Sequence, residues 1–211
     1  WFSLSKRCIF SLTASCSAIE TTNDMTEAQD PRVFSDPTGG VPSPPLPDVI
    51  SEGLAVVFCG INPGMRAAAS GHHFEGNGNR FWRVLHLAGF TPVLMRPEND
   101  RDLLAHRCGL TTAVGRPTAR ADQLSPHEFH ASTSALLRKI ELHRPTCIAF
   151  LGKAAYVAIS GQRHVLWGRQ NATFGGSVVW LLPNPSGLNR SFSLDDLVGA
   201  YRALYLAYAS L

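Results

Sequence analysis

The chain has 211 residues, of which 45% are hydrophobic and 17% charged; this balance predicts one soluble globular domain with an additional tail. No apolar run approaches the roughly 18–20 residues that span a bilayer, so we expect no membrane partner. The formal net charge is +3, but residues 1–48 hold 3 basic and 6 acidic side chains, whereas residues 49–211 hold 16 and 10. The positive balance of the second part suits a partner rich in phosphates without requiring one.

Residues 1–48 are predicted to be a disordered tail, or a targeting or non-native extension. Residues 1–19 contain Lys6, Arg7, several serines and no acid, a composition shared by transit peptides, short signal sequences and translated upstream sequence. Residues 26–48 are rich in proline, which predicts an extended lead-in. The folded domain is therefore placed at residues 49–211.

Strand-sized apolar runs alternate with stretches of helical spacing along this domain. The predicted strands are Leu54–Cys59, Gly109–Thr112, Cys147–Leu151 and Val178–Leu182. Helices are predicted for Asn79–Ala88 (with Phe81, Trp82, Leu85 and Leu87 facing inward), Asp100–His106, Ser125–His143, Ala154–Ile159 and Ser193–Tyr208. This order predicts the α/β class, with a mostly parallel central sheet flanked by helices on both faces.

The first predicted strand stops at Gly60-Ile61-Asn62-Pro63-Gly64. Such a motif is typical of a tight loop behind a buried strand, and ligands of open α/β sheets bind at the carboxyl ends of strands. A carboxamide held there on rigid backbone is a candidate ligand-binding group, although Asn-Pro is also an ordinary turn.

A second loop of the same kind, Pro183-Asn184-Pro185-Ser186-Gly187-Leu188-Asn189-Arg190, follows the last predicted strand. With VVFCGINPG (56–64), GHHFEGNGNRFW (71–82), RCGLTTAVGRPT (107–118) and LGKAAY (151–156), it resembles the mismatch-specific uracil/thymine DNA glycosylases, a branch of the uracil-DNA glycosylase superfamily. The resemblance extends from about Leu46 to Tyr208. It implies a three-layer sandwich and a single glycosylase domain that needs no cofactor and no metal.

The resemblance implies that Asn62 is the catalytic residue, which places the attacking water. An amide oxygen accepts a hydrogen bond from water but takes no proton, so Asn62 positions the water without acting as a base. Phe74 is expected to stack on an extruded base, and Ile61 and Gly64 are expected to line the same base pocket. Backbone N–H groups near Ile61 and Phe74 are the natural donors to the carbonyl oxygens of the base. Without the resemblance, a core position for Phe74 and a turn role for Asn62 remain open.

Further residues are expected to line the base pocket. Ala67, like Ala68, is small enough to leave room for a 5-methyl group. His73 matches thymine-processing relatives, but the His72-His73 pair also reads as a solvated loop feature. Asn79 is either a pocket residue or a helix N-cap, and Asn184 is expected to face the base or sugar.

The second loop is expected to contact the duplex. Leu188 resembles an apolar wedge that fills the gap left by a flipped nucleotide, unless it packs into the core. Gly187 permits close backbone approach there, Asn189 flanks the wedge, and Arg190 is expected to reach a guanine or a phosphate.

The resulting hypothesis is a monofunctional glycosylase that removes uracil, thymine or other altered pyrimidines mispaired with guanine in double-stranded DNA. Only Lys139 and Lys153 could form a Schiff base in the domain, and Lys139 is expected to be solvated. A nucleoside-binding α/β hydrolase of free small molecules and a mismatch-binding module without chemistry remain alternatives. We expect a monomer, cytoplasmic (nucleoid) in a bacterium and nuclear or organellar in a eukaryote.

The five cysteines, Cys8, Cys16, Cys59, Cys108 and Cys147, contain no CxxC pair. We expect those in the domain to be buried, reduced core residues, which argues against zinc and iron–sulfur clusters.

Overall fold

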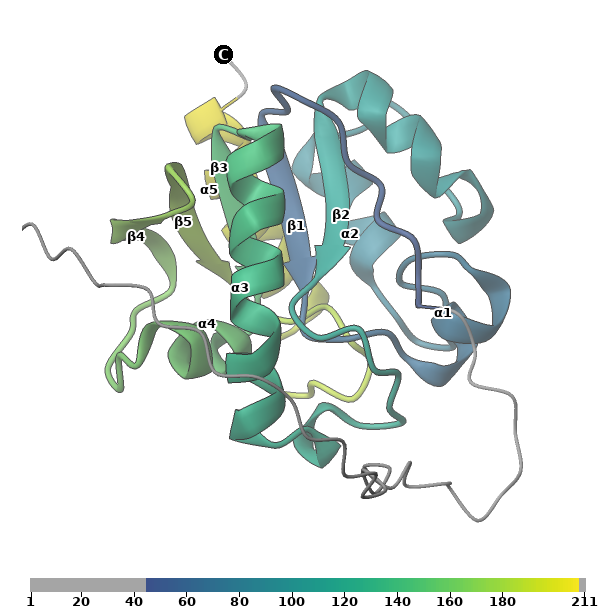
Figure 1. Cartoon of the computed structure of the whole chain (residues 1–211). Coiled ribbons are helices and arrows are strands. Elements are labelled where there is room, and N and C mark those ends of the chain that lie inside the picture. The colour runs from purple at the N-terminus through teal and green to yellow at the C-terminus, as the bar shows by residue number, and fades with distance from the viewer. Residues whose placement is uncertain (1–44, 209–211) are drawn as a thin grey trace, which may run out of the picture. The chain divides into compact units, whose positions relative to one another are not determined.

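The protein is seen here in a computed structural model that describes residues 45–208. A five-stranded sheet with strand order β2-β1-β3-β5-β4 forms its centre (Figure 1). Neighbours among β1 (Val56–Gly60), β2 (Cys108–Thr112), β3 (Cys147–Leu151) and β5 (Ser177–Leu182) are parallel, and β4 (Gly168–Phe174) runs antiparallel to β5. The predicted α/β fold is confirmed. The expected tail lies largely outside the described residues.

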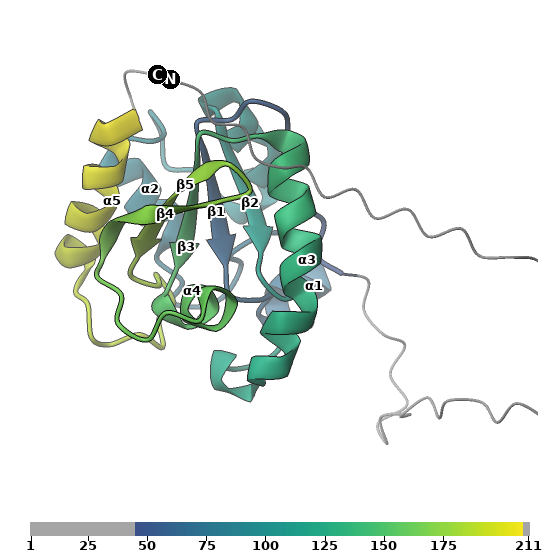
Figure 2. The ribbon, with the colours of Figure 1, turned by 60° about the vertical axis from the view of Figure 1, so that its left-hand side comes forward.

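Helices cover both faces of the sheet (Figure 2). One face carries α3 (Pro126–His143) and α4 (Lys153–Ser160), and the other carries α2 (Phe81–Ala88) and α5 (Leu194–Tyr208). Further elements lie in the connections: α1 (Met65–Ser70) and the 3₁₀ helices η1 (Pro97–His106) and η2 (Ala121–Gln123). No helix within residues 45–208 is long and apolar enough to cross a membrane.

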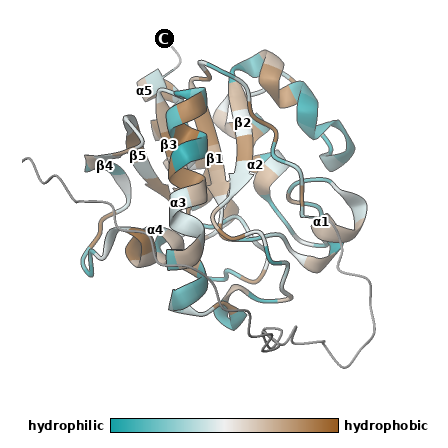
Figure 3. Cartoon of the chain, in the orientation of Figure 1, coloured by the Kyte–Doolittle hydropathy of each residue, from teal (hydrophilic) through white to brown (hydrophobic). Residues whose placement is uncertain are grey.

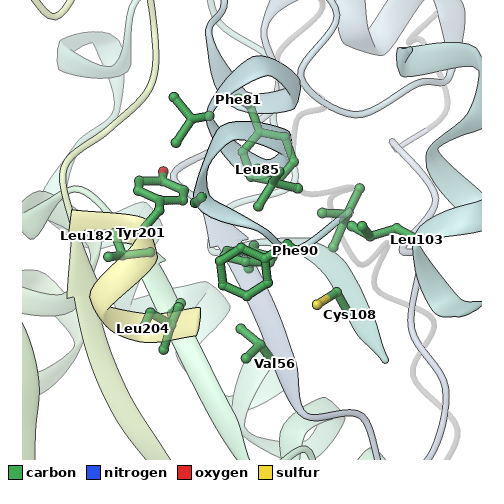
Figure 4. Close-up of a cluster of buried hydrophobic side chains, with 14 of the residues drawn as sticks. Val56, Phe81, Leu85, Phe90, Leu103, Cys108, Leu182, Tyr201 and Leu204 are labelled. Carbon is green, nitrogen blue, oxygen red and sulfur yellow. The ribbon is translucent and has the colours of Figure 1, made fainter. Parts of the chain in front are cut away.

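The alternation of side chains along a strand explains the three layers. In β1, Val56 and Phe58 join the buried cluster under α2 and α5, whereas Val57 and Cys59 join the one under α3 and α4. Figure 4 shows the first cluster around Val56 and Tyr201, and Figure 3 shows apolar residues concentrated in the central strands. Burying each large apolar side chain stabilises the fold by about 1.5–3 kcal/mol.

Within residues 45–208 the structure contains three elements that the sequence did not predict: β4, α1 and the three-residue η2. Strand β4 lies at the sheet edge, and its largely exposed, polar sequence GRQNATF lacks the apolar signal of a core strand. Helix α1 has only six residues and one buried side chain, Ala67, so it shows no helical apolar period. The inward prediction for Leu87 is wrong, because this side chain is 40% exposed on α2.

The parallel strands carry their loops to one edge of the sheet, the lower edge in Figure 1. The chain passes from β1 to β2 on one side and then to β3 on the other side of β1. Ligand sites of open α/β sheets lie at such a switch point, outside the carboxyl ends of the strands. The loops after β1 and β5, which carry the two Asn-Pro motifs, lie at this edge.

Candidate functional site

A cavity of about 140 Å³ opens at the carboxyl edge of the sheet, beside the ends of β1 and β3. Because a protein cavity of about 150 Å³ can hold benzene, this one is the size of a single six-membered ring. Nine of the twelve residues predicted for the site line it: Ile61, Asn62, Gly64, Ala67, His73, Phe74, Asn79, Asn184 and Leu188. Gly187, Asn189 and Arg190 do not, and neither do Ala68 and His72.

The amide of Asn62 has one held end and one unpaired end. Its Nδ2 lies 2.9 Å from the carbonyl oxygen of Arg116, 3.2 Å from that of Pro63 and 2.7 Å from Thr118 Oγ1. The Thr118 hydroxyl donates to the carbonyl of Arg120 at 2.8 Å, so it accepts from Asn62. A flipped amide would turn Oδ1 toward oxygen atoms, which fixes the orientation. Oδ1 has no hydrogen-bond partner among the described residues.

The loop that supplies two of these acceptors is itself held by an ion pair. Arg116 Nε lies 2.6 Å from Glu128 Oε1, and the same guanidinium donates to the carbonyl of Gln123 at 2.9 Å. Glu128 also closes the capping box of α3 with Ser125. Hydrogen bonding from Arg116 and then Ser125 lowers the pKa of Glu128 to about 2, so the carboxylate stays ionised well below neutral pH.

Phe74 presents an aromatic face to the cavity. Its ring is stacked on that of Phe81, with centroids 3.8 Å apart and planes inclined by 21°. Phe74 has a φ of 57°, in the left-handed region that a bulky residue rarely adopts. Such strain costs about 1–3 kcal/mol and is found where the surrounding structure needs the side chain in one place. The ring lies against the end of β1, where a Cβ on Gly60 would be 3.6 Å from its edge, an ordinary contact distance.

His73 lines the cavity with a buried, neutral imidazole ring. Its Nε2 lies 2.9 Å from the carbonyl oxygen of Pro47, which can only accept, so Nε2 carries the proton of the neutral ring. Burial lowers the pKa of His73, although the bond to Pro47 and the charges of Asp100 and Asp48 oppose this shift. Its backbone N–H donates to Asp100 Oδ2 at 3.0 Å, and its carbonyl accepts from Trp82 Nε1 at 3.3 Å.

The base-pocket role considered for Asn79 is compatible with its position, whereas the N-cap of α2 is the next residue, Arg80. Its Oδ1 accepts from the N–H of Phe81 at the start of α2 (3.0 Å), while the residue also lines the cavity. Asn184 is arranged likewise: its Oδ1 accepts from the N–H of Ser186 at 2.9 Å. The NH₂ groups of both side chains are thus the ends available to a ligand.

Leu188 is 71% exposed at the mouth of the cavity and does not pack into the core. The glycine before it permits a close approach within the protein: a Cβ on Gly187 would lie 2.6 Å from the carbonyl oxygen of Gly78. Asn189 uses its side chain inside the loop, where Nδ2 donates to the carbonyl of Asn184 at 2.9 Å. Arg190 is exposed and has no side-chain partner among the described residues.

Arg80 organises this exposed loop, and the sequence analysis missed it. Its guanidinium donates to the carbonyl oxygens of Pro185 (3.3 Å), Ser186 (3.2 Å), Asn189 (2.9 Å) and Phe192 (2.7 Å). No local signal distinguishes an arginine that does this from an exposed one. Four charge-assisted bonds fix the backbone on both sides of Leu188.

Other residues of the cavity were also missed. Thr118, Thr112, Glu75 and Leu46 all line it. Thr112 and Thr118 both lie within the RCGLTTAVGRPT motif (107–118), so the motif itself was the available signal. The Oε1 atom of Glu75 lies 3.9 Å from the Nη2 atom of Arg66. Leu46 had been assigned to the tail.

The described residues offer no metal centre, since no three His, Cys, Asp or Glu side chains of theirs gather at one point. Cys59, Cys108 and Cys147 are free and buried, as predicted for the domain. Burial raises the pKa of each thiol, to about 12 for Cys108 and Cys147, so these thiols stay protonated and unreactive. Cys8 and Cys16 lie outside the described residues.

Comparison with known proteins agrees with this geometry. The sequence model of the uracil DNA glycosylase superfamily matches residues 47–205. A solution NMR structure from Methanosarcina acetivorans, described as that of a candidate uracil DNA glycosylase, superposes with a TM-score of 0.52 at 20% sequence identity. The match covers 77% of this chain and 98% of the archaeal one, which shows a shared fold.

Proposed function

Because the chain belongs to the uracil DNA glycosylase superfamily, we propose that it is a DNA glycosylase that hydrolyses the N-glycosidic bond of uracil or thymine mispaired with guanine in double-stranded DNA. The observation that carries this proposal is the amide of Asn62, which lines a ring-sized cavity with its NH₂ group held and its carbonyl oxygen unpaired. The archaeal structural neighbour, which shares the fold and is described as a candidate uracil DNA glycosylase, supports the coarser part of this proposal, a DNA glycosylase.

In the proposed reaction the bond between C1′ of the sugar and N1 of the base breaks, and its electron pair leaves with the base. Water, which donates a hydrogen bond to Oδ1 of Asn62, forms the new bond to C1′ and loses a proton to solvent, and the departing base takes up a proton from solvent. The products are the free pyrimidine and an abasic site. Because the amide takes no proton, the rate depends strongly on how well the base carries negative charge.

The cavity suits an extruded pyrimidine. The free face of Phe74 replaces the stacking lost in the duplex, a contact worth about 1–3 kcal/mol. Ala67, buried in the cavity wall, leaves room for a methyl group at the 5-position. Leu188 is exposed and lines the cavity, which supports a role in entering the gap in the duplex, a role that a hydrolase of free nucleosides does not need.

We also propose that the enzyme has no lyase activity. Lys153 is the first residue of α4, and its side chain contacts the segment that follows this helix. Its Nζ donates to the carbonyl of Val165 at 2.5 Å and lies 4.6 Å from the ring centre of Trp167. Lys139 pairs with Asp48. Neither lysine lines the cavity, so neither is placed to attack C1′, and borohydride should trap no covalent complex with DNA.

A panel of duplexes tests the function: uracil or thymine is placed opposite guanine or adenine, incubated with excess protein and treated with alkali. We expect cleavage opposite guanine and much less opposite adenine. Asn62→Ala should lower the single-turnover rate by about a hundredfold or more, because the water loses its position, while affinity for an abasic duplex is retained. Asn171→Ala, an exposed position on β4, is the matched control.

Equal release opposite guanine and adenine would contradict mispair specificity. Release from free nucleosides but from no duplex would favour the small-molecule hydrolase. Binding without release would favour a mismatch-binding module.

A further inference from the structure

The segment of residues 45–48, here called the lead-in segment, forms part of the cavity wall. Leu46 is 9% exposed and lines the cavity. The carbonyl oxygen of Pro47 accepts a hydrogen bond from the Nε2–H of His73. The sequence placed these residues in the tail. In the structure they precede β1 and yet contact the site that lies after it.

A closed set of three side chains, here called the lead-in anchor, holds this segment. It consists of Asp48, Thr111 of β2 and Lys139 of α3. Lys139 Nζ lies 2.5 Å from Asp48 Oδ2 and 2.9 Å from Thr111 Oγ1, and the threonine hydroxyl donates to Asp48 Oδ1 at 2.6 Å. Both carboxylate oxygens therefore have a partner. The prediction that Lys139 is a solvated helix residue is wrong, because its side chain is only 27% exposed.

The backbone alone does not hold the segment. Val49 exchanges two hydrogen bonds with Leu110 (2.9 and 2.7 Å), and Gly109 permits this approach, since a Cβ there would lie 2.7 Å from the Val49 carbonyl oxygen. This bridge ends at Val49. Among the described residues, the polar contacts of residues 45–48 are those of the Asp48 side chain and the hydrogen bond from His73 to the Pro47 carbonyl.

We propose that Asp48, Thr111 and Lys139 are positioning residues for the bound base: they hold Leu46 and Pro47 as one wall of the cavity and thereby keep His73 in its Nε2–H form. The part of this inference that concerns the base rests on the proposed function. The part that concerns His73 does not, and it is measured without substrate.

The chain offers a matched control. Glu52 and Arg144 also form an ion pair between the segment before β1 and the end of α3, but their side chains are 69% and 72% exposed. Neither lines the cavity. Asp48→Ala and Glu52→Ala therefore each remove one carboxylate from the same stretch of chain, and only the first releases the cavity wall.

The first measurement is the ¹⁵N spectrum of the His73 imidazole in the free protein. We expect a single Nε2–H tautomer in the unmodified protein and in Glu52→Ala. Asp48→Ala and Lys139→Met should shift His73 toward a mixture of tautomers. If Asp48→Ala does not fold, Thr111→Val, which keeps the side-chain volume, tests the same anchor. An unchanged tautomer in folded anchor variants would overturn the proposal.

The second measurement is single-turnover base release from a duplex with a G/U mispair. Because small misplacements of a reacting group are costly, Asp48→Ala and Lys139→Met should lower the rate roughly tenfold, with abasic-duplex affinity unchanged. Lys139→Arg, which keeps the charge, should restore most of the rate. A rate like that of Glu52→Ala would overturn the proposal even if the tautomer shifts. If the unmodified protein releases no base from any duplex, the proposed function fails. The His73 tautomer, measured without substrate, then still tests whether the lead-in anchor holds the cavity wall.

Discussion

At the scale of single residues, Asn62 depends on its neighbours for its chemistry. A free asparagine side chain can turn either end of its amide toward a ligand. Here the hydroxyl of Thr118 and two backbone carbonyls accept from the NH₂ end, which leaves the oxygen without a partner among the described residues. In the proposed reaction, the rate therefore rests on the orientation of a neutral group.

This dependence predicts the effect of changing Thr118. Thr118→Val removes the hydroxyl that accepts from Asn62 at 2.7 Å, so the amide loses its fixed orientation and single-turnover release should fall about tenfold. Thr118→Ser keeps the hydroxyl and should remain within about threefold of the unmodified rate. Equal rates for valine and serine at this position would show that the hydroxyl does not orient the amide.

His73 predicts a dependence of stability on pH. Burial lowers its pKa below the ordinary 6.5, so the unfolded chain takes up a proton at a higher pH than the folded protein does. The contribution of His73 to stability is therefore complete above about pH 6.5 and declines as the pH falls below that value.

We expect the melting temperature to drop between pH 7.5 and 5.5, and to drop less in His73→Gln, which keeps a donor for Pro47 but does not titrate in this range. His127→Gln, at an exposed position of α3, should retain the full drop. Parallel curves for the three proteins would show that His73 is not the group responsible.

At the scale of elements, the start of α2 and the loop after β5 act as one unit. Arg80 holds four carbonyls of the loop, and the backbones of Gly78 and Gly187 are in contact. From α5, the hydroxyl of Tyr201 donates to the carbonyl of Pro183 at 3.2 Å, where the loop begins. The exposed Leu188 is thus carried on backbone that is ordered before DNA binds.

A variant that no longer holds the loop after β5 in place should lose activity as a variant without the Leu188 side chain does. Arg80→Lys keeps one charge but not the forked donors, so release should fall about tenfold, as in Leu188→Ala. The double variant should lose little more than either alone, because both changes act on one step. The loss should be larger for a well-paired uracil than for a mispaired one, which is already partly unstacked.

Arg83→Lys on the exposed side of the same helix is the control. Losses that simply multiply in the double variant would mean that Arg80 acts elsewhere.

At the scale of the whole molecule, residues 49–211 carry 16 basic and 10 acidic side chains. Neutralising a phosphate releases counterions, so duplex affinity should fall as salt rises, by a slope of about 0.9 per contact in a plot of log affinity against log salt. Arg190→Ala should reduce this slope by about one unit, because the residue is exposed beside Leu188. A flat salt response would contradict binding through phosphates.

Much of this molecule follows from its sequence by local rules. Apolar runs bounded by turn residues predict β1, β3 and β5, and the Ser-Pro start predicts α3, because these signals act over a few residues. Asn62 and Leu188 both line the cavity because each lies in a loop that follows a strand, and parallel topology brings such loops to one edge of the sheet. Strand β4 was missed because an exposed edge strand has no apolar period.

Only the tertiary structure decided which distant residues hold Asn62 and the loop of Leu188 in position. Thr118 meets Asn62 across 56 positions, and Arg80 meets Asn189 across 109. The lead-in segment lies against the cavity because Lys139, on a helix far along the chain, forms an ion pair with Asp48. A threonine, an arginine or a lysine has the same local pattern whether it faces solvent or a partner far along the chain. Its role is therefore determined by packing, in which the whole sheet takes part.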